Sequence, residues 1–471
     1  MAPSTHLAIV GAGPGGYAAA FLAADLGMRV TLIDDEPHPG GVCLYRGCMP
    51  SKALLHVARL LTESRQAREW GIEFPDPRID LDKLRAWKSG VVRRLTGGLG
   101  QLSKQRAVNY IRGRASIIDP TTLSVRSGDA DEQIVFDQAI LATGSRPASL
   151  PTLSLASDRM LDSTTALELA DVPRTLLVVG GGYIGLELGT VYAALGSQVT
   201  VVEMTSGLLP GVDRDLVSVL SRRLEAVFHA IRLDTKVSKL EEEPQGIRVT
   251  FEGAAGEPEQ VFDKILMAVG RVPNSEIAGL DKTNVELDSR GFVKVDAHRR
   301  TGEPTIFAIG DVVGEPMLAH KASHEGRVAV ETIAGHSVSF EPQAIPAVVF
   351  TDPELAWCGL TEAQAAQEQR PVQAVRFPWA ASGRAVTLDR PDGLTKLVLD
   401  PQTERILGVG IVGTGAGELI AEGVVAIEMA ARASDLKRCI HPHPTLSETL
   451  MESAETFFGQ ATHVYRPRKR S

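Results

Sequence analysis

The sequence has few cysteines, no long apolar run and no excess of basic residues. Its four cysteines are fewer than a disulfide-stapled secreted protein of 471 residues would normally carry. No stretch reaches the roughly 18 to 20 consecutive apolar residues that a membrane span needs. The first apolar run follows neither a basic segment nor a signal-cleavage pattern. We therefore expect a cytoplasmic protein without a membrane partner.

The charge balance narrows the classes of partner. A formal net charge of -9 argues against a nucleic-acid or anionic-membrane surface. The hydrophobic content of 44% with 23% charged residues is typical of a globular protein, and the length suggests about three domains. The basic residues at the end of the chain are expected to form a solvated tail. They are Arg466, Arg468, Lys469 and Arg470.

An internal repeat is the strongest organisational feature. The segments Leu7–Asp34 and Leu176–Glu203 each contain an apolar strand, a G-x-G-x-x-G turn and an apolar helix that ends at Gly27 or Gly196. A β-branched strand and an acidic residue then follow in both. One such turn is weak evidence, but two complete strand–turn–helix–strand units indicate two dinucleotide-binding units.

Each glycine of the repeat has a separate physical role. The first permits the tight turn, the second lets backbone approach a pyrophosphate, and the third lets the helix pack closely on the sheet. The pyrophosphate then binds the free N–H groups at the helix N-terminus. These glycines are Gly11, Gly13 and Gly16 in the first unit and Gly180, Gly182 and Gly185 in the second.

The acid that ends each unit is expected to bind an adenosine ribose. Asp34 and Glu203 stand at the ends of the second strands, where a carboxylate accepts hydrogen bonds from ribose hydroxyls. Glu203 would also repel a 2′-phosphate, and the first basic residue after it is Arg214, too far along to bind one. The second unit therefore favours NAD over NADP.

Two cysteines lie in a glycine-rich segment. The spacing of Cys43 and Cys48 lets the chain fold back to the roughly 5.5 Å between Cα atoms that a disulfide requires. Pro50 favours a helix that starts near Cys48, where the helix dipole and Lys52 would favour a thiolate. The alternatives are a metal pair or inert thiols, but further ligands at zinc-like spacing are missing nearby, so we expect redox chemistry and no metal.

A candidate acid–base group lies near the end of the chain. Thiol–disulfide chemistry needs a base, and a histidine oriented by a carboxylate has a suitable pKa. His443 and Glu448 are five residues apart, on a loop that enters a helix expected to begin near Thr445. His441 is a second candidate by composition, and a structural role for either histidine stays open at this level.

Together these motifs resemble a known family. The sequence also contains A-T-G at residues 142–144 and A-x-G-D at residues 308–311, and residues 40–52 read G-G-x-C-x-x-x-G-C-x-P-S-K. This set is similar to that of the pyridine nucleotide–disulfide oxidoreductases. The resemblance implies an α/β fold with two Rossmann-like domains, the NAD domain inserted in the FAD domain, and a C-terminal α+β dimerisation domain. The implied boundaries are 1–148 and 277–345 for the FAD-binding and central parts, 149–276 for the NAD-binding domain and 346–471 for the dimerisation domain.

The resemblance also implies roles in the redox site. Cys43 would be the interchange thiol that meets substrate, and Cys48 the thiol in contact with the flavin. Lys52 would lie beside the flavin N5, paired with Glu187, although an acid in a first helical turn is also favourable without that role. His443, oriented by Glu448, would reach the cysteines from the partner subunit of a homodimer.

Further cofactor contacts follow from the same resemblance. Asp311 would bond the flavin ribityl chain, unless it is a turn or helix-cap residue. His320 matches a position near the flavin pyrimidine ring. The other positions are Ala115, Thr143, Gly144 and Ala319 for FAD and Gly270 for NAD.

One branch of the family matches best. Glutathione and trypanothione reductases carry arginines after the second unit, mercuric reductases carry a C-terminal cysteine pair, and soluble transhydrogenases lack the second active-site cysteine. The dihydrolipoamide dehydrogenases remain, and this resemblance implies NAD⁺-linked oxidation of dihydrolipoyl groups. The implied partner is the dihydrolipoyl domain of an acyltransferase in a 2-oxo acid dehydrogenase complex, or a glycine-cleavage carrier protein. Two alternative functions are an NADH-dependent reductase of another disulfide and a non-catalytic scaffold protein. Tyr45 and Arg46 stand where the commonest members carry Asn and Val.

Overall fold

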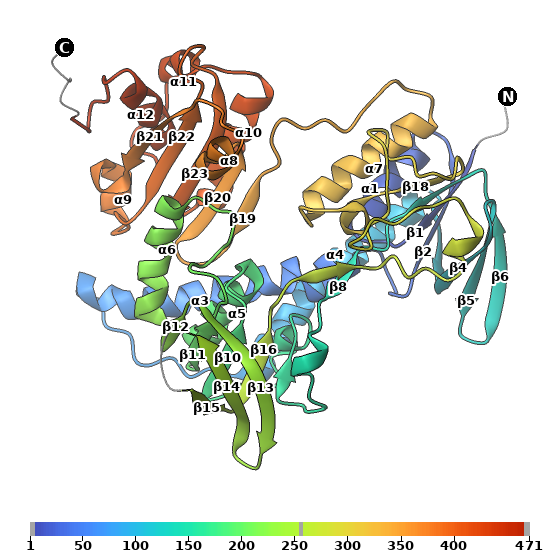
Figure 1. Cartoon of the computed structure of the whole chain (residues 1–471), viewed down its shortest axis with the longest axis horizontal. Coiled ribbons are helices and arrows are strands. Elements are labelled where there is room, and N and C mark those ends of the chain that lie inside the picture. Colours follow the sequence, from blue (N-terminus) through green and yellow to red (C-terminus); the bar gives the residue numbers. More distant parts are fainter. Residues whose placement is uncertain (1–4, 254–257, 466–471) are drawn as a thin grey trace.

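The computed structural model describes residues 5–253 and 258–465, and Figure 1 shows them as three lobes. One lobe surrounds β1, one surrounds β10, and the third contains the C-terminal helices and strands. The basic residues expected to form a solvated tail lie outside the described residues. Among the residues that are described, no helix is long and apolar enough to cross a membrane.

The first lobe is built on a parallel five-stranded sheet. Its spatial order is β18(Ile306–Ala308), β7(Gln138–Leu141), β1(His6–Val10), β2(Arg29–Asp34) and β3(Asn109–Arg112). Apolar residues fill both faces of this sheet, as expected for parallel strands. One face is covered by α1(Pro14–Asp25) and α7(Ala319–Ile333), and the other by an antiparallel sheet of β4(Arg114–Asp119), β5(Thr122–Ser127) and β6(Ala130–Val135).

The second lobe repeats this plan. Its sheet has the order β12(Ala230–Arg232), β11(Gln198–Val202), β10(Thr175–Val179), β16(Lys264–Met267) and β9(Met160–Leu161). Its faces are covered by α5(Tyr183–Leu195) and by the sheet of β13(Thr235–Glu243), β14(Gly246–Gly253) and β15(Glu259–Phe262). Because β18 follows all of these strands in sequence yet pairs with β7, the second unit is inserted in the first. The chain passes from the first lobe to the second after β7 and returns after β16. The segments at these two points, β8(Ser145–Pro147) and β17(Arg271–Pro273), pair as an antiparallel two-stranded ribbon.

Three α-helices lie between β2 and β3, and the first two carry the cysteine motif. They are α2(Gly41–Arg46), α3(Cys48–Gln66) and α4(Leu81–Gln105). The sequence predicted a folded-back loop around Cys43, but the structure forms the short helix α2 there. The predicted helix start near Cys48 is confirmed, since α3 begins at that residue. Leu54 and Leu55 of α3 belong to the same apolar core as α5, so the cysteine motif is fixed between the two nucleotide-binding lobes.

The C-terminal lobe is an antiparallel sheet covered by helices. Its strand order is β19(Ala347–Val349), β20(Glu354–Gly359), β23(Ile406–Gly413), β22(Leu394–Leu399) and β21(Gln373–Pro378). Its helices are α8(Glu362–Gln367), α9(Gly383–Thr387), α10(Ala416–Glu428), α11(Ala433–Arg438) and α12(Glu448–Phe457). Two Rossmann-like sheets and this α+β lobe confirm the predicted fold class.

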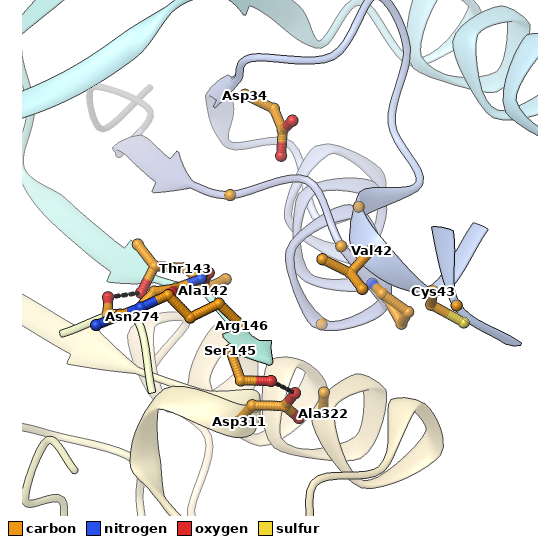
Figure 2. A pocket seen from close by; sticks show the side chains of 18 of the residues that line it. Asp34, Val42, Cys43, Ala142, Thr143, Ser145, Arg146, Asn274, Asp311 and Ala322 are labelled. Carbon is orange, nitrogen blue, oxygen red and sulfur yellow. Dashed lines mark hydrogen bonds between the residues drawn. The ribbon is translucent and has the colours of Figure 1, made fainter. Parts of the chain in front are cut away.

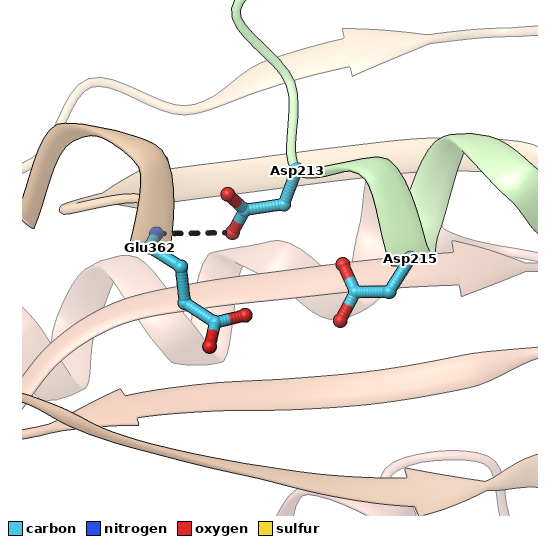
Figure 3. Close-up of side chains that lie close together, drawn as sticks. All are labelled: Asp213, Asp215 and Glu362. Carbon is cyan, nitrogen blue, oxygen red and sulfur yellow. Dashed lines mark hydrogen bonds between the residues drawn. The ribbon is translucent and has the colours of Figure 1, made fainter. Parts of the chain in front are cut away.

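A charge network centred on the buried Lys396 and Asp213 joins the second lobe to the C-terminal lobe. Asp213 and Asp215 lie at the start of α6(Arg214–Val227), close to Glu362 of α8 (Figure 3). Lys396 of β22 is only 1% exposed, and its Nζ lies 2.7 Å from Asp213, 3.1 Å from Asp215 and in contact with Glu362. Arg376 of β21 pairs with two of these acids. The Lys396 ammonium therefore lies among the carboxylates where a metal ion could otherwise bind. Its ion pairs connect the second lobe to the C-terminal lobe.

Candidate active site

A cavity of about 920 Å³ lies where the first nucleotide unit meets the cysteine helices. Its volume is at the upper end of the roughly 300–1,000 Å³ common for ligand pockets. Figure 2 shows residues from distant segments around it, among them Asp34, Cys43, Thr143 and Asp311. The expected FAD contacts Ala115, Gly144 and Ala319 also line it.

The two glycine turns have the same geometry, which a residue with a side chain could not adopt without strain. Gly11 and Gly180 have φ angles of +100° and +108°, and a Cβ on either would lie 2.2 or 2.4 Å from a backbone oxygen. A Cβ on Gly16 or Gly185 would lie 1.9 or 2.5 Å from the oxygen of the first glycine. Only glycine is compatible with these positions, as the sequence repeat predicted.

The second glycine of each turn faces open space instead. A Cβ on Gly13 would meet nothing closer than 4.0 Å, and nothing lies within 4 Å at Gly182. Gly13 and Pro14 line the cavity and begin α1, which has no side-chain cap. The open, uncapped N-terminus fits a dinucleotide pyrophosphate, so the residues present fit FAD in the first unit and NAD in the second.

The acids after the second strands brace the turns. Asp34 accepts the Ala12 N–H at 2.6 Å, and Glu203 accepts the corresponding Gly181 N–H at 2.7 Å. Glu203 also accepts the N–H of Thr205 at 2.8 Å. Backbone donors hold each carboxylate beside the turn, where a ribose would lie. The two units match in these contacts as well as in sequence.

Arg214, the first basic residue after Glu203, uses its guanidinium to bind backbone carbonyl oxygens. Its guanidinium donates to the carbonyl oxygens of Leu208, Leu209 and Val212 at 2.6 to 3.0 Å. These bonds hold the loop before α6. The arrangement supports the expectation that Arg214 does not serve a 2′-phosphate.

Asp311 lies at the turn after β18 and faces the cavity. Ser145 donates its hydroxyl hydrogen to Asp311 at 2.5 Å (Figure 2). The Arg271 guanidinium donates to the same hydroxyl oxygen at 2.7 Å. The Gly310 N–H donates at 2.6 Å to Glu325, a fully buried carboxylate. This bond fixes the turn that presents Asp311.

Sequence reasoning missed several of these supporting residues. Glu325 forms ion pairs with Arg299 and Lys321, the latter one helical turn before it. The i,i+4 spacing of Lys321 and Glu325 in α7 was the only available signal. Ser145 had no such signal, because its partner Asp311 is far away in sequence.

The two cysteines line the cavity as free thiols. The hydrogen bond with the Cys43 thiol lowers the pKa of Cys48 to about 7. The nearby Lys52 charge adds to this effect, and burial of the thiol opposes it. The same hydrogen bond and burial raise the pKa of Cys43 well above its ordinary value. The position of Cys48 at the first residue of α3 adds the favourable end of the helix dipole. Cys48 is therefore the thiol more readily ionised.

An ion pair lies beside the cysteines. The Lys52 Nζ lies 2.8 Å from a Glu187 carboxylate oxygen, although the two residues are far apart in sequence. The other oxygen of Glu187 accepts the Phe350 N–H at 2.9 Å, and the ammonium lies 4.5 Å from the Phe350 ring centroid. Phe350, which the sequence did not indicate, thus joins the C-terminal lobe to this pair.

The histidine–glutamate dyad is formed in the C-terminal lobe. His443 Nδ1 lies 2.9 Å from Glu448, whose second oxygen accepts the Thr445 N–H at 2.8 Å. Burial opposes ionisation of Glu448, but these bonds outweigh it and lower its pKa. The prediction of a helix start near Thr445 was wrong, because α12 begins at Glu448 and Thr445 forms the preceding turn with Pro442.

The two candidate histidines differ in exposure. The His443 side chain is 73% exposed, whereas His441 is buried against Glu422 at 2.8 Å. His441 also contacts the Cys439 carbonyl oxygen at 3.0 Å. The exposed ring of His443 is free to meet another molecule, and His441 holds the loop.

Some expected residues are not brought to the cavity within one chain. His443 and Glu448 are not among its lining residues, and neither is His320. The His320 ring contacts the Pro346 carbonyl oxygen at 2.7 Å, and burial lowers its pKa. Gly270, with φ +112° and open space around its Cβ position, lies on the second unit after β16.

Solved structures share this architecture along nearly the whole chain. LpdA from Mycobacterium tuberculosis superposes with a TM-score of 0.89 at 27% identity, covering 96% of this chain and 99% of that one. The HOCl-induced flavoprotein disulfide reductase RclA from Escherichia coli gives a TM-score of 0.85 at 27% identity, with 96% and 99% coverage.

Sequence comparison identifies the family. Residues 5–326 match the model of the pyridine nucleotide-disulphide oxidoreductases, and residues 345–454 match the dimerisation domain of the same family. A dihydrolipoyl dehydrogenase from Haemophilus influenzae is 48% identical over 461 residues, covering 98% of this chain and 96% of the relative. One from Geobacillus stearothermophilus is 44% identical, covering 98% of each chain. The chain belongs to the pyridine nucleotide-disulphide oxidoreductase family.

Proposed function

We propose that this protein is a dihydrolipoamide dehydrogenase, which oxidises dihydrolipoyl groups and reduces NAD⁺. The observation that carries the proposal is the position of the cysteine pair. Cys43 and Cys48 line the same cavity as the Gly13 turn and the Lys52–Glu187 ion pair. A thiol pair beside an uncapped dinucleotide turn suits electron transfer between sulfur and a flavin. Curated relatives named dihydrolipoyl dehydrogenase support the choice of substrate.

The proposed reaction begins with an oxidised Cys43–Cys48 disulfide. His443 takes a proton from one dihydrolipoyl thiol, and the resulting thiolate attacks Sγ of Cys43. The Cys43–Cys48 bond breaks, and Cys48 leaves as a thiolate. The second substrate thiol then attacks the substrate sulfur of the mixed disulfide, which releases the cyclic lipoyl disulfide and Cys43. His443 gives its proton to the departing Cys43 sulfur, and the proton of the second substrate thiol passes to solvent, so the substrate loses two electrons and two protons.

The lowered pKa of Cys48 suits its role as the leaving group. A sulfur that is stable as a thiolate near neutral pH leaves readily in thiol–disulfide exchange. The raised pKa of Cys43 keeps this thiol protonated, so one negative charge is held next to Lys52. Glu187 and Phe350 keep the lysine in that position.

Two cofactors complete the proposed site. FAD in the cavity of the first unit would accept two electrons from the reduced cysteine pair and pass a hydride to NAD⁺. Gly13, Asp34 and Asp311 would hold its pyrophosphate, adenosine ribose and ribityl chain. Glu203 would bind the NAD ribose beside the Gly182 turn. The exposed Met204 after it supplies no cation for a 2′-phosphate.

The acid–base group is proposed to come from the partner subunit. The chain carries the family's dimerisation domain and forms a homodimer. Within one chain, His443 is exposed and lies away from the residues that line the cavity. Dimerisation would bring the dyad of one subunit to the cysteines of the other. The reducing partner would be the dihydrolipoyl domain of an acyltransferase or of a glycine-cleavage carrier, in the cytoplasm.

A comparison of substrates tests the proposal. We expect the purified holoenzyme to reduce NAD⁺ with dihydrolipoamide, followed by NADH absorbance, far faster than it reduces glutathione disulfide or oxidised thioredoxin with NADH. NAD⁺ should be preferred to NADP⁺ by about 100-fold, because Glu203 repels the extra phosphate. Faster turnover of either disulfide than of dihydrolipoamide would instead identify a reductase of another disulfide.

The pH dependence of thiol alkylation tests the roles of the cysteines. In the reduced protein freed of FAD, which would otherwise cover Cys48, the alkylation rate of Cys48 by iodoacetamide should rise with a midpoint near pH 7, since only the thiolate reacts. Peptide mass spectrometry assigns the modified residue. Cys358 is the internal control, because burial raises its pKa to about 12 and keeps it protonated. Lys52→Gln should move the midpoint upward, and preferential alkylation of Cys43 below pH 8 would contradict the assignment.

A further inference from the structure

Tyr45 and Arg46, the two residues that depart from the commonest active-site signature, both contact one loop. This loop, residues 35–39, connects β2 to α2 and directly follows Asp34. Tyr45 and Arg46 lie at the end of α2, between the two cysteines. Their shared contact suggests that the departure concerns the cofactor cavity as well as the thiols.

Arg46 reaches from the redox helix to the acidic end of β2. Its guanidinium pairs with the Glu36 carboxylate, and its side chain is 43% exposed while also lining the cavity. The Glu36 N–H donates to Asp34 at 3.0 Å. The partner that positions Arg46 is thus attached to the acid proposed to bind the adenosine ribose.

The loop itself is held firmly. The Tyr45 hydroxyl donates to the His38 carbonyl oxygen at 3.0 Å, and the His38 N–H lies 3.2 Å from the same hydroxyl. The Tyr110 hydroxyl donates to the Glu36 carbonyl oxygen at 2.8 Å. The His38 ring packs against Gly100 of α4, where a Cβ would lie 2.8 Å from it. Arg46 therefore pairs with a fixed acid.

The start of α2 contacts the pyrophosphate turn. A Cβ on Gly41 would lie 2.5 Å from the Gly13 Cα, so the first residue of α2 is pressed against the turn that begins α1. The other cationic residues that line the cavity lie on other elements than α2, and they are Lys52, Arg114, Arg126, Arg146 and Arg271. A pyrophosphate carries two negative charges, and the helix N-terminus supplies only partial positive charge.

We propose that Arg46, held by Glu36, is an FAD-retaining residue that supplies the counter-charge to the pyrophosphate. Arg46 is the last residue of α2, whose first residue contacts the Gly13 turn and whose last side chains contact the loop of residues 35–39. The inference rests on the proposed placement of FAD in this cavity. It gives the unusual Tyr45–Arg46 pair a binding role: Tyr45 fixes the loop, Glu36 orients the guanidinium, and the guanidinium meets the anion.

The rate of FAD release tests this inference. Holoprotein with Arg46→Val should release FAD at least about 10-fold faster than wild type, as expected for loss of a charge-assisted hydrogen bond. Release is followed by the rise in flavin fluorescence after dilution. Arg59→Val is the matched control, because Arg59 is also 43% exposed in an ion pair, with Glu63, but is not among the cavity-lining residues. Arg59→Val should release FAD at the wild-type rate.

Salt dependence separates charge from a general loosening of the fold. Wild-type release should accelerate as ionic strength rises, whereas Arg46→Val should respond much less, since its charge is already gone. Arg46→Lys should recover part of the retention. The apoprotein of each variant should unfold at the wild-type temperature. Equal release rates for wild type and Arg46→Val would overturn this inference alone, whereas a wild-type protein that binds no FAD would overturn the proposed function.

Discussion

Replacement of Cys43 by serine is expected to abolish oxidation of dihydrolipoamide. Loss of a member of a covalent catalytic unit costs about 10⁴- to 10⁶-fold in kcat. Serine is nearly isosteric with cysteine but cannot form the disulfide that accepts the substrate electrons. The fall is measured by NADH production with dihydrolipoamide and NAD⁺, and bound flavin is measured by its absorbance. Cys48→Ser should give the same loss.

Two further variants show whether the loss of activity in Cys43→Ser reflects the thiol chemistry of the cavity. Cys439→Ser removes an exposed thiol outside the cavity and should leave the rate unchanged. His443→Gln keeps both cavity thiols and should lower kcat by about 10²- to 10⁴-fold, the usual contribution of acid–base catalysis. Full activity in Cys43→Ser, with FAD retained, would exclude the thiol mechanism and favour a scaffold role.

Lys396→Met is expected to cause the largest loss of stability. Removal of one partner from a buried ion pair typically costs about 3–5 kcal/mol, because the remaining charges stay buried without compensation. Lys396 holds Asp213, Asp215 and Glu362 together, and methionine leaves those three acids facing one another with Arg376 as their cation. The loss is measured as a lower midpoint of urea-induced unfolding.

The control for this prediction is an exposed ion pair. Lys83 pairs with Asp80 at the start of α4 with its side chain 87% exposed, so Lys83→Met should hardly change the unfolding midpoint. Added Mg²⁺ or Ca²⁺ should partly restore the stability of Lys396→Met, because a cation could then replace the ammonium among the carboxylates. Similar midpoints for the two variants would show that the network contributes little.

The nucleotide turns could be predicted because their causes are local. Gly11 and Gly180 need positive φ angles, and Gly16 and Gly185 must admit a neighbouring backbone oxygen. Each requirement acts within a few residues, so it leaves a spacing in the sequence. The start of α3 at Cys48 was predictable for the same reason, through the proline two residues later.

The supporting contacts could not be predicted because they join distant segments. Ser145 bonds Asp311, and the Phe350 backbone bonds Glu187, across more than a hundred residues. A backbone donor such as that of Phe350 has no sequence signature at all. The start of α12 was misplaced because the Glu448 carboxylate, bonded to the Thr445 N–H, closes a turn before the helix begins. The Lys52–Glu187 pair was predicted only through the family resemblance, because residue spacing does not relate two residues so far apart in sequence.

The insertion of one nucleotide unit within the other has a consequence for folding during synthesis. Ile306 of β18 pairs with Ala139 of β7, so the first sheet lacks this edge strand until the whole inserted unit has been translated. At about 5–20 residues per second, that interval lasts roughly ten to thirty seconds. During this time the apolar edge of β7 is open to mispairing with other chains. β18 can reach the waiting edge only after the strands of the inserted lobe have been made.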